Sequence, residues 1–176
     1  MEKKNLDIDA GIIEKCREGD RMAQYEIYRR YSKTMFNVAI RMSGDRYQAE
    51  DVLQESFFQA FDKIDQFKGE SDFGQWLKRI VINNCIDKLR KKKIQFEELD
   101  KAIVNSSGYD EIESMTDAGL VHEIIKTLPE GARQIFVMVA MEGYKHKEVS
   151  EVLSISESTS KSQFIRAKML LVKQLT

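Results

Sequence analysis

The sequence predicts an all-α protein of two small helical domains, and three observations support this fold class. Apolar residues recur three or four positions apart along most of the 176-residue chain, which is the spacing of one helix face. One proline and nine glycines leave little room for the many turns of a β-rich fold. Between residues 94 and 116 this pattern fails in an acidic stretch containing Ser-Ser-Gly. We therefore expect domains at 1–93 and 117–176, joined by a flexible linker at 94–116.

The first domain should contain four helices. The first covers residues 9–18, and Asp20 should cap the second, which runs to about residue 42. Asp45 should cap the third, which covers 47–65, and after a polar loop the fourth covers 73–93. The side chains expected to face the core are Ile12, Ile13, Cys16, Tyr28, Tyr31, Met35, Val38, Ala39, Met42, Leu53, Phe57, Ala60, Phe61, Ile64, Leu77, Val81, Cys85 and Leu89.

The second domain should be a small bundle that ends in a helix-turn-helix. Helical pattern resumes at residue 117, Pro129 is placed for a first turn, and residues 132–141 are apolar on nearly all sides. A short helix over 145–153 then meets a polar turn, and a longer helix begins near residue 157. The inward positions of the helix-turn-helix are Val149, Val152, Leu153, Ile155, Ser160, Phe164, Ala167 and Leu171.

The overall net charge of −1 hides two basic segments separated by acidic ones. Residues 73–93 carry 7 basic and 1 acidic side chains, a net of +6, and residues 131–176 carry a net of +3. Two basic segments on a nearly neutral chain suggest two contacts with nucleic acid. No apolar run approaches a membrane span and the N-terminus lacks a signal-peptide pattern, so a cytoplasmic protein is expected.

The last helix has a basic outer face. Lys161, Ile165 and Lys168 follow helical spacing away from the core, and Arg166 lies beside them. A helix of this kind fits the major groove, where Lys and Arg reach phosphates and guanine edges. The alternative is a short helical hairpin inside an all-α core.

Two other helix faces are polar, and each has two interpretations. On the fourth helix the sector opposite the core holds Trp76, Arg79, Asn83, Asp87 and Arg90. An aromatic beside Arg and Asn can stack on and read unpaired bases, or Trp76 can simply border the core among snorkelling cations. On the third helix Asp51, Glu55, Gln59 and Asp62 form a row. Spacing alone favours a solvated face for this row over a docking surface.

Two blocks of the chain together resemble bacterial sigma factors of the extracytoplasmic-function (ECF) type. Residues 49–91, AEDVLQESFFQAFDKIDQFKGESDFGQWLKRIVINNCIDKLRK, are similar to the family's region two, and residues 128–171 are similar to its region four. The resemblance implies core RNA polymerase and promoter DNA as partners, and raises an anti-sigma factor as a further one. It implies no cofactor, metal, catalysis or small-molecule substrate.

The resemblance also assigns roles to residues. It makes the acidic row a polymerase-docking surface, with Asp51, Gln54, Glu55 and Asp62 as its residues. It places recognition and melting of the promoter −10 element on Lys68, Phe73, Trp76, Arg79, Asn83, Asp87 and Arg90. It places reading of the duplex −35 element on Ser158, Thr159, Lys161, Ser162, Ile165, Arg166 and Lys168.

The second block departs from the family pattern at several positions. Ser154 stands where the turn usually has Gly, Ser160 stands at an inward position that is often Val, and Gln163 stands where Arg is common. These departures put any particular −35 sequence in doubt. The alternative function is an autonomous helix-turn-helix regulator of transcription. An enzyme is not expected, because His122 and His146 have no companions in a metal-ligand or catalytic pattern.

Overall fold

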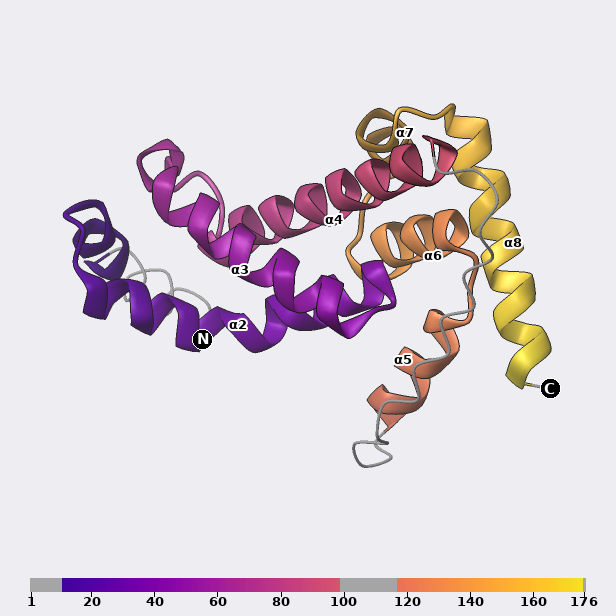
Figure 1. Cartoon of the computed structure of the whole chain (residues 1–176), viewed down its shortest axis with the longest axis horizontal. Helices are drawn as coiled ribbons and strands as arrows, with labels where there is room; N and C mark the ends of the chain where they lie inside the picture. Colours follow the sequence, from indigo (N-terminus) through magenta and orange to yellow (C-terminus); the bar gives the residue numbers. More distant parts are fainter. Residues whose placement is uncertain (1–10, 99–116, 176) are drawn as a thin grey trace. The chain divides into compact units, whose positions relative to one another are not determined.

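The computed structural model describes residues 11–98 and 117–175, and within these ranges all regular structure is helical (Figure 1). The described residues form two compact units: 11–40 with 45–86, and 41–44 with 87–98 and 117–175. The all-α prediction is confirmed for these residues. Of the linker predicted at 94–116, residues 94–98 belong to a helix and 99–116 lie outside the described residues.

The helices of the first unit begin close to the predicted positions. They are a short helix over 11–17, α2 (Arg21–Ser43), α3 (Arg46–Asp62), the 3-10 turn η1 (Ile64–Gln66) and α4 (Phe73–Glu98). The predicted caps form, because carboxylates of Asp20 and Asp45 accept first-turn amides of α2 and α3 at 2.7 and 2.8 Å. The third helix ends three residues earlier than predicted, since the chain tightens into η1.

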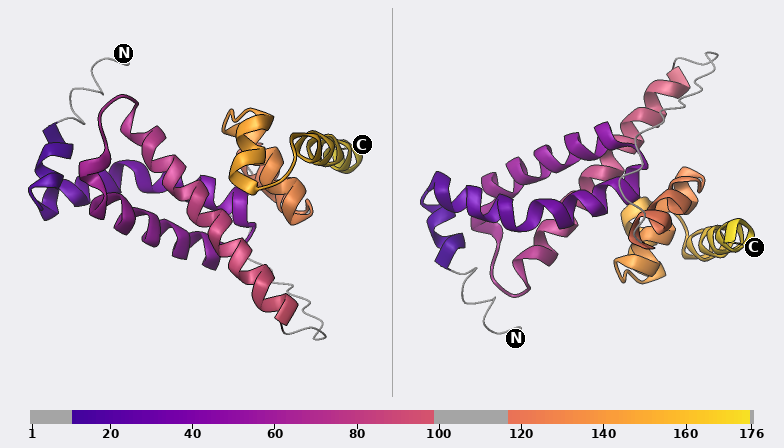
Figure 2. Two further views of the ribbon diagram at one scale, coloured as in Figure 1. Left: turned by 90° about the horizontal axis from the view of Figure 1, so that it is seen from above. Right: turned by 90° about the horizontal axis from the view of Figure 1, so that it is seen from below.

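The core of the first unit follows the predicted seams with one clear exception. In α2 the side chain of Ile27 is fully buried, at 0% exposure, whereas the neighbouring Tyr28 is 40% exposed. The Tyr28 ring packs edge-on against Phe57 of α3, with centroids 4.8 Å apart, so it borders the core while its polar end is near solvent. In all three views α2 and α3 run side by side (Figures 1 and 2).

The inward seam of α4 is broader than predicted. Leu77, Val81 and Cys85 are buried as expected, and Ile82 and Ile86 are buried as well. Burial of two adjacent seams means that α4 packs against more than one helix of its unit. A helix with such a broad apolar face leaves only a narrow polar sector exposed.

A buried polar contact ties α3 to α4. The Asn84 side-chain amide donates to Ser56 Oγ at 3.0 Å, and Ser56 Oγ donates to the Val52 carbonyl oxygen at 2.6 Å. Both side chains are buried, so the chain of bonds satisfies groups that would otherwise be costly to desolvate.

The second unit contains five helical elements besides its part of α4. They are α5 (Asp117–Lys126), α6 (Glu130–Phe136), the π-helical turn η2 (Val137–Met141), α7 (His146–Leu153) and α8 (Glu157–Leu175). Both α6 and α7 pack on α8. Pro129 stands at the N-cap of α6, one position before the predicted first turn. The apolar stretch predicted over 132–141 is thus a short α-helix that widens into a π-turn, and its Ala132, Ile135 and Val137 are buried.

No helix among the described residues is both long enough and apolar enough to span a membrane.

Candidate nucleic-acid interface

Three aromatic rings gather where η1 leads into α4. The rings of Phe67, Phe73 and Trp76 lie with centroids 5.3 to 5.4 Å apart, in edge-on and tilted arrangements. Phe73 is 1% exposed and also meets Tyr31 of α2 at 5.5 Å, whereas Trp76 is half-buried. The cluster therefore has a buried base, and Trp76 at its edge stays partly accessible.

The start of α4 is shaped by Asp72 and Gly74. Asp72 Oδ1 accepts the Gln75 amide at 3.1 Å, which caps the helix. A Cβ on Gly74 would lie 2.9 Å from both Asp72 Oδ1 and Tyr31 Cε1, so only glycine permits α2 to approach this turn so closely. The loop before the cap exposes Lys68 and turns at Gly69, whose φ is +73°.

The structure brings together five of the seven residues predicted for the −10 element. Lys68, Arg79 and Asn83 are exposed in the first unit, with Trp76 half-buried. Phe73 lies beneath the surface, so its position suits packing of Trp76 rather than a contact with DNA. Asp87 and Arg90 are exposed but belong to the second unit, where Arg90 donates to the Val152 carbonyl oxygen at 2.8 Å.

The outer face of α3 carries the predicted acidic row and an aromatic side chain that spacing arguments missed. Asp51, Gln54, Glu55 and Asp62 are all exposed. Phe58, which follows Glu55 by three residues and precedes Asp62 by four, is 81% exposed on the same face. A signal that could have found it is its spacing from Glu55 and Asp62, which places Phe58 on the polar row rather than on the seam of Leu53 and Phe57.

A shallow recess adjoins this row at Gln54. Its walls come from α2 and α3 and consist of Tyr28, Phe36, Arg46, Glu50, Leu53 and Gln54. An exposed aromatic side chain on a charged helix face is a feature of many binding surfaces, so the outer face of α3 is a candidate docking surface.

The helix-turn-helix is held together by a polar contact through its centre. Ser160 of α8 is 0% exposed, as its inward prediction requires, and its Oγ lies 2.9 Å from Nδ1 of His146 at the start of α7. The His146 ring also meets Phe164 edge-on, with centroids 5.4 Å apart. Ser160 is therefore accommodated by a hydrogen-bonding partner, which the sequence could not indicate because the two residues lie 14 positions apart.

The turn between α7 and α8 is strained at Ser154. This residue has φ 55° and ψ 46°, the left-handed conformation that glycine adopts without cost. Ser156 follows, and its Oγ accepts the Thr159 amide at 3.0 Å, which caps α8. The turn thus keeps the geometry of a glycine-type helix end although it lacks the glycine.

The seven residues predicted for the −35 element all lie on the exposed face of α8, while Ser160 and Ala167 lie on the buried face. Lys161 pairs with Glu157 at 2.7 Å, and this hydrogen bond lowers the pKa of the Glu157 carboxyl. Lys168 Nζ lies 5.6 Å from the centre of the Phe164 ring. The exposed face of α8 therefore carries charged and hydroxyl side chains, together with the apolar Ile165, Met169 and Val172.

Comparison with known families shows which family this chain belongs to. The family model described as Sigma-70 region 2 matches residues 27–94, and the one described as Sigma-70, region 4 matches residues 118–171. The chain belongs to the sigma factor family. The ECF RNA polymerase sigma factor SigW of Bacillus subtilis (strain 168) is 29% identical over 177 aligned positions, covering 93% of this chain and 94% of that protein. The RNA polymerase sigma-H factor of Pseudomonas aeruginosa is 27% identical, covering 95% and 93%.

Solved sigma factor structures show the same fold. The sigma factor RpoE, solved with the anti-sigma factor NepR from Bartonella quintana, superposes with a TM-score of 0.62 at 20% identity, covering 86% of this chain and 95% of that one. CnrH, solved with the cytosolic domain of CnrY, gives 0.54 at 22% identity, covering 95% and 96%.

This ECF-type sigma factor directs promoter-specific transcription initiation with core RNA polymerase as its partner. The presence of region two beside region four does not favour the alternative of an autonomous helix-turn-helix regulator. Sigma factors as a family are not enzymes. Among the described residues, no group of three or more His, Cys, Asp or Glu side chains is placed to hold a metal ion.

Proposed function

We propose that the two domains of this sigma factor divide promoter recognition, with the −10 strand held by residues 1–93 and the −35 duplex read by residues 117–176, and with 94–116 as their linker. The observation that carries this division is the two-sided character of α8, whose basic and hydroxyl side chains face outward while Ser160 and Ala167 face inward. Rigid helices suit duplex reading, whereas an accessible indole beside a polar loop suits an unstacked base.

The −35 contact is assigned to the exposed face of α8. Each phosphate neutralised by Arg166 or Lys168 contributes about 0.9 to the slope of log affinity against log salt. We expect Arg166→Ala and Lys168→Ala to weaken binding of holoenzyme to promoter duplex and to lower that slope by about 1 each. Lys173→Ala is the matched control, because it removes the same charge from the last turn of α8. A slope unchanged by both substitutions would show that neither residue contacts a phosphate.

The −10 contact is assigned to the edge of Trp76 together with Lys68, Arg79 and Asn83. Stacking of a base on an aromatic side chain is worth about 1–3 kcal/mol, so Trp76→Ala should slow promoter opening by roughly tenfold or more. Opening is measured by permanganate reactivity of unpaired thymines, and polymerase binding is measured separately. Equal loss of both activities would assign Trp76 to the core instead.

Polymerase docking is assigned to the outer face of α3, with Asp51, Gln54, Glu55 and Asp62 around Phe58. An exposed aromatic at the centre of a charged patch is a typical hot spot of binding, where truncation costs about 2 kcal/mol. Phe58→Ala should therefore weaken core polymerase binding about thirtyfold while leaving the fold intact, since 81% of the side chain is exposed. Binding equal to that of the wild type would remove Phe58 from the surface.

Reconstituted transcription tests the whole proposal. The purified chain, mixed with core polymerase and a library of promoters from its own genome, should yield core-dependent transcripts from defined start sites. Tight sequence-specific duplex binding by the isolated chain, with no transcript in the presence of core polymerase, would support the autonomous regulator instead.

Three expectations complete the proposal. The structural neighbours RpoE and CnrH were solved with NepR and CnrY, and by extension we propose an anti-sigma factor as a regulatory partner of this chain. Purification of the chain from its native cells should then recover a protein that inhibits the reconstituted transcription.

We also propose a cytoplasmic location, where core polymerase works, and no catalysis, cofactor or small-molecule substrate.

A further inference from the structure

The loop over residues 68–72 is anchored at its α4 end by its own sequence. Asp72 Oδ1 accepts the Gln75 amide, and the Asp72 carbonyl oxygen accepts the Trp76 amide at 3.1 Å. These contacts fix where α4 begins. They do not fix the other end of the loop, which leaves η1 at Phe67.

The Phe67 end is held by the bond of its amide to the Ile64 carbonyl oxygen at 3.1 Å and by a residue far away in the sequence. Nη2 of Arg17, in the helix over 11–17, donates to the Phe67 carbonyl oxygen at 2.6 Å across 50 residues of sequence. The Phe67 ring is buried and packs against Trp76, with centroids 5.4 Å apart. The carbonyl that Arg17 contacts is therefore part of the residue that supports the indole.

The Arg17 guanidinium is oriented by carboxylates on both sides of this contact. Its Nη1 lies 2.7 Å from Glu14 Oε2, and its Nε lies 3.9 Å from Asp65 Oδ1. A guanidinium presents its donors in a fixed fork, so the hydrogen bond from Nη1 to Glu14 orients Nη2 toward the carbonyl, with the Asp65 charge as a weaker attraction at 3.9 Å. Arg17 thus bridges its own helix, η1 and the first residue before the loop.

We propose that Arg17 is a positioning residue for the −10 strand: it fixes the Phe67 end of the loop and thereby the accessible edge of Trp76. This inference rests on the proposed role of Trp76 in holding an unpaired base. The cationic Arg17 side chain is 31% exposed, so the competing role is a direct contact with a DNA phosphate. The two roles predict different Trp76 fluorescence in the absence of DNA and a different salt dependence of promoter binding.

The first experiment needs no DNA, because Trp76 is the one tryptophan of the sequence. We expect Arg17→Met to shift the emission of the full-length chain to the red and to raise its quenching by acrylamide, with far-UV circular dichroism unchanged. Arg17→Lys keeps a donor and should restore part of the wild-type spectrum. An Arg17→Met spectrum identical to that of the wild type would overturn the proposal, whatever the function of the chain.

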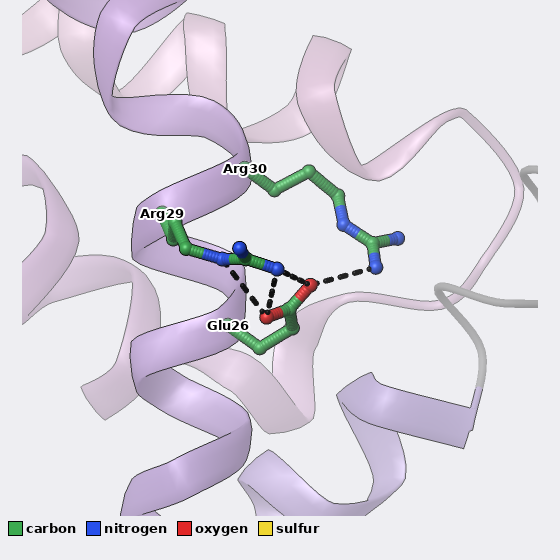
Figure 3. Close-up of polar contacts among 3 residues, drawn as sticks. All are labelled: Glu26, Arg29 and Arg30. Atoms are coloured by element: carbon green, nitrogen blue, oxygen red, sulfur yellow. Dashed lines mark hydrogen bonds and ion pairs between the residues drawn. The ribbon is translucent and has the colours of Figure 1, made fainter.

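Arg29→Met is the matched control. Arg29 of α2 pairs with Glu26 on its own helix at 2.9 Å (Figure 3). Its side chain is 67% exposed. The substitution removes the same charge from the same unit, and we expect no change in Trp76 emission. A change as large as that of Arg17→Met would mean that the spectrum responds to net charge, which overturns the proposal.

The second experiment uses holoenzyme and a promoter at several salt concentrations. Arg17→Met removes one charge-assisted hydrogen bond, so holoenzyme with this variant should open the promoter roughly tenfold less. Its polymerase binding and the slope of log promoter affinity against log salt should be unchanged. A slope lowered by about 1 would show that Arg17 contacts a DNA phosphate, which overturns the proposed positioning role. Unchanged opening despite altered fluorescence also overturns it. If the wild type itself opens no promoter, the proposed function fails, while the fluorescence result still decides whether Arg17 holds the loop.

Discussion

Replacement of Ser160 tests whether the centre of the helix-turn-helix depends on a polar contact or on apolar packing. A simple apolar seam would gain stability from Ser160→Val. The structure predicts the opposite sign, because the Ser160 hydroxyl is fully buried and lies 2.9 Å from His146 Nδ1. Ser160→Ala removes this bond without adding volume, and Ser160→Val removes it and adds a methyl group as well.

The expected magnitudes follow from these two changes. A buried hydrogen bond contributes about 1 kcal/mol, so Ser160→Ala should lower the unfolding free energy by about that amount. Extra volume in a fully packed site costs about 1–3 kcal/mol, partly offset by about 0.8 kcal/mol for the added apolar group. Ser160→Val should therefore cost about 2 kcal/mol. For a domain of this size, 1 kcal/mol corresponds to about 4–8 °C in Tm.

Thermal unfolding of the whole chain, followed by circular dichroism, gives the Tm, and amide hydrogen exchange within α8 assigns the effect to this helix. Ser162→Ala is the control: Ser162 is exposed on the same helix, its Oγ donating to the Thr159 carbonyl at 3.0 Å. It should change stability by less than about 0.5 kcal/mol. A Ser160→Val chain as stable as the wild type, or more stable, would refute the assigned importance of the His146 contact.

Three further predictions concern the backbone and the thiols. Gly74→Ala should destabilise the first unit by about 1–3 kcal/mol, because its Cβ would lie 2.9 Å from Tyr31 and Asp72 atoms; urea unfolding followed by Trp76 fluorescence measures this, and an unchanged midpoint would contradict it. Ser154→Gly should raise the Tm, because glycine adopts the left-handed conformation without the strain of about 1–2 kcal/mol that serine carries there. This gain exceeds the cost of about 0.4–1 kcal/mol that the added freedom of glycine brings in the unfolded chain. A lower Tm would show that contacts of the serine hydroxyl matter more. Burial, aided by the Asp20 charge, raises the pKa of the Cys16 thiol to about 11 from 9.0, so alkylation at pH 8 should be about 100-fold slower than in urea; rapid alkylation of the native chain would contradict this.

Sequence reasoning succeeded where the cause of a structure is local. Asp20 and Asp45 cap helices because a cap needs only the next three residues, and both caps form. The inward placement of Ser160 follows from helical spacing alone and is confirmed. Spacing failed to separate Ile27 from Tyr28, because adjacent residues on a helix differ by only 100° and the packing of neighbouring helices decides between them.

What could not be predicted depends on pairs of residues far apart in the chain. Nothing in the local sequence connects Arg17 with Phe67, or His146 with Ser160. Phe58 was in neither the expected core nor the acidic row, because its spacing takes it off the core seam and an apolar residue is not counted in a polar row. The roles of the α8 and α3 residues toward DNA and polymerase stay predictions, which the substitutions above test.

The buried bond between Asn84 and Ser56 has a consequence for how this family can change over time. Losing Ser56 leaves the buried Asn84 amide without this acceptor, which costs about 1–3 kcal/mol, whereas an apolar pair of matching size would be nearly neutral. Losing Asn84 costs less, because Ser56 Oγ keeps its bond to the Val52 carbonyl oxygen. Among relatives of this chain, an Asn at position 84 should therefore be accompanied by a hydrogen-bonding side chain at position 56, and this covariation can be counted in sequences alone.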